Sequence, residues 1–164
     1  MQLRQVAEKV ARDEIEGQRQ AMVALLAELE VYSTALADID RKMSNDLGVL
    51  LSGMLQMIFP SASFRFAVYR ANADKVWAIP DDRIRRTVIA IYAELDLFFS
   101  LLDRNSAIAE GIRDDSMPSS QISEKLLGLY PVIRQQLDKL LPQVKKLRED
   151  LAAQVIVVAA SLNK

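Results

Sequence analysis

Apolar residues recur every seven positions along the first third of the chain. They are Ile15, Met22, Leu29, Leu36, Met43, Leu50 and Met57, and several are followed three positions later by Gln18, Leu25, Tyr32 or Ile39. Steps of three and four residues are typical of a helix that packs lengthwise against other helices. The pattern predicts a long helix over about residues 3–58, which ends at Phe59 because the residue before a proline disfavours helical geometry.

Two later stretches carry the same period. Over about 82–105, a predicted helix follows Asp81, whose carboxylate is suited to cap it. This helix is expected to end near Asn105 or near Gly111. A second long helix is predicted over about 121–162, where apolar residues repeat in near-heptad register. Pro131 and Pro142 interrupt it, and each removes a backbone donor. The sequence leaves open whether these prolines bend this helix or break it.

The remaining segments are short. Residues 63–73 are predicted to form a short helix, and 111–120, which combine glycine, serine, proline and charge without periodicity, a loop. We therefore expect an all-α fold in one domain, residues 1–164. The expected architecture is an elongated antiparallel helical bundle with two long outer helices and a shorter middle helical pair.

The composition limits the kinds of catalytic and metal site that the chain can form. Hydrophobic residues make up 51% of the chain but aromatic residues only 6%, which favours an aliphatic core. Histidine and cysteine are absent. Their absence excludes thiolate metal sites and the Glu-x-x-His di-iron motif of helical bundles. Glu94 and Asp96 are two residues apart on a helix and hence on different faces. We expect no catalytic residues, no metal site and no cofactor.

Charge argues against a nucleic-acid partner. The 21 basic and 22 acidic residues give a net charge of −1, whereas binding to phosphates requires a basic surplus. Two basic clusters, at 83–86 and 145–148, are flanked by Asp81, Asp82, Glu149 and Asp150. We interpret both as solvated faces whose charge is largely neutralised.

The C-terminal run, residues 151–162, contains no charged residue. Its apolar side chains lie all round the helix, so one packed stripe cannot cover them. The run is too short to span a bilayer. We predict a surface for a partner or for self-association, made by Leu151, Val155, Ile156, Val157, Val158 and Leu162. The alternative is that residues 1–17 fold over this run.

A second candidate lies between the predicted helices at 63–73 and 82–105. Tyr69, Asn72, Asp74 and Trp77 form the most polar and aromatic stretch of the chain. They predict a corner that binds a ligand or a partner. Packing of Trp77 over the end of the bundle would explain the same residues.

The residues of this stretch also carry a resemblance. Phe66-x-x-Tyr69-x-Ala71-Asn72-x-Asp74-Lys75, followed by Ile79-Pro80-Asp81 and Tyr92, resembles a segment of a family of bacterial helical proteins. The similarity covers about residues 64–105. Proteins of that family usually carry an N-terminal membrane helix, and no activity is assigned to them. Residues 1–164 contain no such helix, which is a departure from the family unless the helix precedes Met1. The resemblance implies a location near a membrane and no functional residues.

Together these observations favour a non-enzymatic interaction or scaffold module that acts through apolar helix faces. Its expected partner is another protein or a second copy of the chain. A ligand-binding or signal-relaying helical domain of a membrane-associated protein is the alternative, and an enzyme with histidine-free chemistry is a third hypothesis. We expect a cytoplasmic protein, with membrane association left open.

Overall fold

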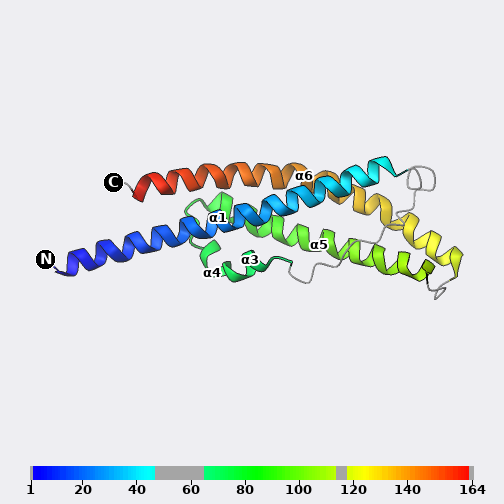
Figure 1. The fold of residues 1–164 in the computed structure, drawn as a ribbon, viewed down its shortest axis with the longest axis horizontal. Coiled ribbons are helices and arrows are strands. Elements are labelled where there is room, and N and C mark those ends of the chain that lie inside the picture. Colours follow the sequence, from blue (N-terminus) through cyan, green and yellow to red (C-terminus); the bar gives the residue numbers. More distant parts are fainter. Residues whose placement is uncertain (1, 47–64, 114–117, 163–164) are drawn as a thin grey trace. The chain divides into compact units, whose positions relative to one another are not determined.

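The computed structural model describes residues 2–46, 65–113 and 118–162, and every regular element in these ranges is an α-helix (Figure 1). The prediction of an all-α helical bundle is therefore confirmed. The two longest helices have 44 residues each. The elements are α1 (Gln2–Asn45), α3 (Ala67–Ala71), α4 (Ala73–Val76), α5 (Asp82–Arg113) and α6 (Ser119–Leu162).

The helices contribute to two compact units, each of which takes a part of α1, α5 and α6. Within each unit, α6 runs opposite to α1 and α5 (Figure 1). The first unit comprises Met1–Tyr32, Phe66–Ala90 and Val144–Lys164, and therefore includes α3 and α4. The second comprises Ser33–Arg65 and Ile91–Gln143.

The core of each unit is the predicted apolar seam. Fully buried aliphatic side chains contribute roughly 1.5–3 kcal/mol each relative to an exposed state. In α1, Ile15 and Gln18 are only half-buried, and the predicted seam positions Leu50 and Met57 lie outside the described residues. The wholly buried core residues include Met22, Leu25, Leu29, Val88, Leu147 and Leu151 in the first unit, and Leu36, Met43, Leu95, Phe98, Ile133, Leu137 and Leu140 in the second.

Helix α5 begins as predicted and ends close to the later of its two expected ends. The Asp81 Oδ1 atom accepts hydrogen bonds from the backbone N–H groups of Arg83 and Ile84, at 2.8 and 3.1 Å. Of the two expected ends, Asn105 is too early and Gly111 lies two residues before the observed one, because α5 continues to Arg113. Ile108 and Ala109 extend the buried face by another turn, and that packing outweighs the polar character of the segment.

The boundaries of the short elements also differ from prediction. In place of one helix over 63–73 there are α3 and α4, separated at Asn72. The Asn72 Nδ2 group donates to the Val68 carbonyl at 2.8 Å and closes the first of these turns. The predicted loop over 111–120 is shorter than expected, since helical residues occur at both of its ends. Residues 63–64 and 114–117 lie outside the described residues, as do the last residues of the predicted helix at 47–58.

Helix α6 is continuous through both prolines, so neither Pro131 nor Pro142 breaks it. Pro131 and Pro142 are exposed, and the carbonyls of Leu127 and Asp138, which lose their helical donors, belong to exposed residues that water can reach. The buried side chains on the opposite face of α6 keep the helix packed through the two interruptions.

Two residues one turn apart on α1 hold the start of α3. The Glu28 carboxylate accepts hydrogen bonds from the N–H groups of Val68 and Tyr69, both at 3.0 Å. The Tyr32 hydroxyl accepts one from the Phe66 N–H at 2.7 Å. Phe66 has a left-handed backbone with φ of 60°, which is unfavourable for a residue with a side chain. These bonds, together with a 5.4 Å contact between the Tyr32 and Phe66 rings, stabilise that conformation.

We predict that Tyr32→Phe lowers the free energy of unfolding by about 1–3 kcal/mol, because the buried Phe66 N–H loses its hydroxyl acceptor. Urea denaturation followed by circular dichroism measures the change. Tyr130→Phe is the matched control, since Tyr130 is half-buried and no hydrogen bond of its hydroxyl is found within the described residues. Equal stability of Tyr32→Phe and the control would contradict this account.

A second prediction concerns the interior prolines. Pro142→Ala restores the backbone donor to the Asp138 carbonyl and should raise the free energy of unfolding by about 2 kcal/mol, measured by thermal and urea denaturation. Pro118→Ala, just before the start of α6, should change it little. Equal effects of the two substitutions on the free energy of unfolding would contradict the claim that Pro142 destabilises α6.

Candidate interaction surface

The C-terminal run of α6 divides into a buried and an exposed side. Leu151 and Val158 are buried in the first unit, whereas Ile156 and Val157 are 70% and 62% exposed. Val155 and Leu162 are half-buried. The six residues of the predicted surface therefore do not all face the same way, because the seam takes part of the run. The exposed part, which we call the α6 outer face, consists of Ala152, Ala153, Ile156, Val157 and Ala160.

The start of α1 does not cover this face. Glu30 forms an ion pair with Arg148. The two helices are antiparallel and have the same rise per residue, so equal numbers of residues from this ion pair reach the same level. Glu16, fourteen residues before Glu30, therefore lies opposite Leu162, fourteen residues after Arg148. Residues 3–14, all exposed, thus extend past the end of α6. The alternative in which residues 1–17 fold over the run does not fit these positions.

A groove of about 500 Å³ adjoins the α6 outer face in the first unit. The Glu30–Arg148 ion pair lies at its polar part. Val23, 43% exposed, lies one turn before the groove residues of α1, and Ile156 one turn beyond Ala152. The lining residues are Leu26, Ala27 and Glu30 from α1, and Lys145, Arg148, Glu149 and Ala152 from α6.

The basic clusters on the same unit are neutralised, as expected from their acidic neighbours. Asp82 pairs with Arg85 and Arg86. Asp150 pairs with Lys146 at 2.9 Å and with Arg83 at 3.5 Å. These carboxylates leave little net charge with which either cluster could attract an anionic partner.

In the predicted corner of Tyr69, Asn72, Asp74 and Trp77, much of the hydrogen bonding is local and involves backbone groups. The Asn72 carbonyl accepts from the N–H groups of Lys75 and Val76. The Trp77 carbonyl accepts from Arg85 Nη1 at 3.2 Å, while the Trp77 side chain is 67% exposed and does not pack over the bundle. Tyr69 is half-buried and Asp74 exposed. Of the four residues, Trp77 therefore presents the largest accessible apolar surface.

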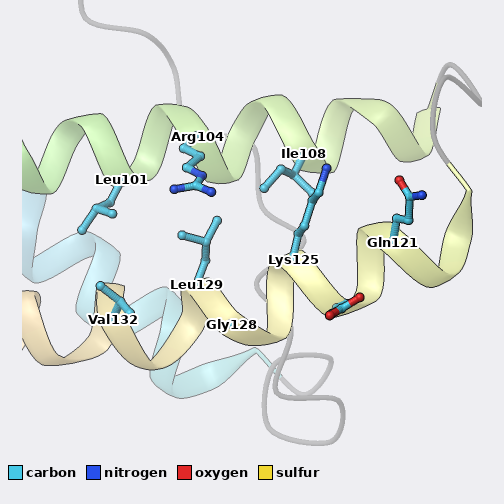
Figure 2. Close-up of a pocket in the computed structure, with 9 residues that line it drawn as sticks. Leu101, Arg104, Ile108, Gln121, Lys125, Gly128, Leu129 and Val132 are labelled. Atoms are coloured by element: carbon cyan, nitrogen blue, oxygen red, sulfur yellow. The ribbon is translucent and has the colours of Figure 1, made fainter.

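A second groove, which the sequence analysis missed, lies between α5 and α6 in the second unit (Figure 2). It has a volume of about 670 Å³. The sequence signals were Leu97, which is apolar but off the seam of α5, and Gly128 inside a helical pattern. The groove is lined by Leu101, Arg104 and Ile108 from α5, and by Gln121, Glu124, Lys125, Gly128, Leu129 and Val132 from α6.

The described part of the chain contains no group of three or more acidic side chains placed to hold a metal ion. In that same part, no helix combines the length and apolar character needed to cross a membrane. Comparison with protein-family models, curated protein sequences and solved structures found no match.

Near the end of α6, one acidic side chain of α1 has a strongly altered affinity for protons. The Glu16 carboxylate accepts hydrogen bonds from Arg19 at 2.7 and 2.8 Å and from Gln20 at 3.0 Å. These bonds, and chiefly those from Arg19, lower the pKa of Glu16 from 4.5 to about 2. Because the folded-state pKa is lowered, the stabilisation is present above about pH 4.5 and is lost as the pH falls towards 2.

We predict that Arg19→Met raises the pKa of Glu16 towards 4.5, because the main hydrogen-bond donor is removed and only Gln20 remains. An NMR titration of the Glu16 side-chain carboxyl carbon measures the shift. Arg4→Met, which removes the partner of Glu8 instead, should leave the pKa of Glu16 unchanged. A titration of Glu16 unaffected by Arg19→Met would contradict the assignment.

Proposed function

We propose that this protein is a non-enzymatic interaction module that binds a protein partner, or a second copy of itself, through the α6 outer face. The observation that carries the proposal is the exposure of Ile156 and Val157 within a helical run that contains no charged residue. Contiguous apolar surface of this kind marks interaction sites in proteins. Covering these two side chains would contribute roughly 1–2 kcal/mol each.

The surroundings support helix docking as the mode of binding. The groove between α1 and α6 continues from the α6 outer face and offers Leu26 and Ala27 beside Ala152. An amphipathic helix can place its apolar face in such a groove, using side chains at steps of three and four residues. Glu30, Lys145, Arg148 and Glu149 would form a polar rim of mixed charge at one end, which favours a protein partner over a strongly charged polymer.

We predict that Val157→Asp abolishes assembly through this surface while leaving most of the helicity, because Val157 is exposed and the substitution places a charge in the contact. The measurement is particle mass by light scattering after gel filtration, with circular dichroism to verify the fold. Leu127→Asp is the matched control, since Leu127 is also exposed on α6 but lies far from the run. A particle mass that is the same for wild type and Val157→Asp would refute the proposal.

Binding to a membrane surface is the alternative use of the same face. Flotation with neutral lipid vesicles separates the two uses. Membrane binding would be indicated if wild type floats with the vesicles, Val157→Asp does not, and the two have the same particle mass in solution. In that case the α6 outer face would bind a bilayer rather than a protein partner.

A further inference from the structure

The groove between α5 and α6 in the second unit has an apolar floor that continues beyond its lining residues. Glu94 of α5 and Lys139 of α6 form an ion pair. Because the two helices are antiparallel, Leu101, seven residues after Glu94, lies opposite Val132, seven residues before Lys139. Leu97, 50% exposed, precedes Leu101 by one turn, and Val132 is 41% exposed. Gly128 adds width, because a Cβ atom there would meet no atom within 4 Å. The accessible apolar part of the floor is therefore made by Leu97, Leu101 and Val132, while Ile108 further along α5 is buried and Arg104 lies between Leu101 and Ile108.

Two basic side chains line this groove, Arg104 near its middle and Lys125 beyond it. Figure 2 shows Arg104 reaching from α5 towards Leu129, and Lys125 reaching from α6 towards Ile108. With Glu124 they give the rim a charge of +1. Among the described residues Arg104 forms no ion pair. An occupant that complements this groove would carry apolar side chains at helical spacing, followed by acidic ones.

The start of α1 has these properties. Leu3, Val6 and Val10 are exposed and form a stripe at steps of three and four residues. At 100° per residue, Asp13 and Glu14 flank the continuation of that stripe, one on each side, while Arg12 lies on the opposite side of the helix. Residues 3–14 are all exposed, so this apolar and acidic face is available for contact.

The two features also match in length. Leu97 to Ile108 spans twelve residues, as does Leu3 to Glu14, which is about 16 Å of helix in each case. With α1 of another copy running in the direction of α5, Leu3 would lie beside Leu97. Val6 would then lie near Leu101 and Val10 beside the Arg104 side chain. Asp13 and Glu14 would reach the level of Ile108 and Lys125.

We propose that the start of α1 from one copy docks into the α5/α6 groove of a second copy. The contact is head to tail, so each chain both inserts a helix and receives one, and the assembly is a ring or an open chain. The inference rests on the proposed role as an interaction module, but it uses surfaces other than the α6 outer face.

A second copy fits this groove better than a small ligand. The groove is an open channel between two helices, whereas small-molecule sites enclose most of their ligand. A docked helix brings its own ridges of side chains and can fill such a channel without enclosure. The matched length and opposite charge occur within this one sequence, which favours the chain itself as the partner.

The test is a charge exchange followed by sedimentation velocity over a roughly hundredfold range of concentration. Wild type should show a mass that rises with concentration. The double variant Arg104→Glu, Lys125→Glu should weaken association at least ~tenfold, because its rim would repel Asp13 and Glu14. Asp13→Lys with Glu14→Lys should weaken it similarly. Combining all four substitutions should restore association, since the charges are again opposite.

Arg12→Glu is the matched control, because it reverses a charge in the same segment on the opposite side of α1. It should leave association unchanged. A wild type that stays monomeric throughout would overturn the inference, as would charge reversals without effect or a quadruple variant that does not recover. Loss of mass in Val157→Asp but not in the charge-reversed variants would refute this contact while leaving the proposed function in place.

Discussion

The aliphatic seam shared by α1, α5 and α6 is the constraint on which the rest of the structure depends. In each unit three helix segments meet along side chains that repeat at three- and four-residue steps and are almost wholly buried. This packing extends α5 to Arg113, and α6 stays helical through Pro131 and Pro142. Because each helix has only one face in the seam, apolar residues outside that face remain in contact with water unless another molecule covers them.

The unburied apolar residues are grouped rather than scattered. Ile156 and Val157 lie in a run free of charge, Leu3, Val6 and Val10 form a stripe, and Leu97 and Val132 border a groove. Single exposed apolar residues are ordinary on protein surfaces, but such groups favour contact with another protein. By contrast, the polar groups of the α3–α4 corner hold its own turns. The proposed function therefore lies in helix faces rather than in this corner.

The sequence predicted the helices well where the apolar periodicity was strong. It predicted them poorly where the local structure depends on hydrogen bonds from side chains to the backbone. The seam of α6 and the capping role of Asp81 followed from spacing and residue type. The division into α3 and α4 did not, because it depends on Asn72 and on Glu28, some forty residues away. Composition indicated that the run at 151–162 had too many apolar residues for one stripe. The spacing could not show which of these residues are exposed, because that depends on how α6 is rotated against its neighbours. It could not show the α5/α6 groove either, because the groove depends on packing around Gly128.

The most direct test of the account is the accessibility of the Ile156 and Val157 methyl groups to a soluble paramagnetic probe, measured by NMR in dilute and in concentrated protein. The account predicts strong broadening of both methyl signals in dilute solution and protection once a second copy or an added protein partner covers them. Buried methyls such as those of Leu147 and Leu151 provide the internal reference. Protection of Ile156 and Val157 in the dilute monomer would contradict the account, because the chain would then cover this surface itself.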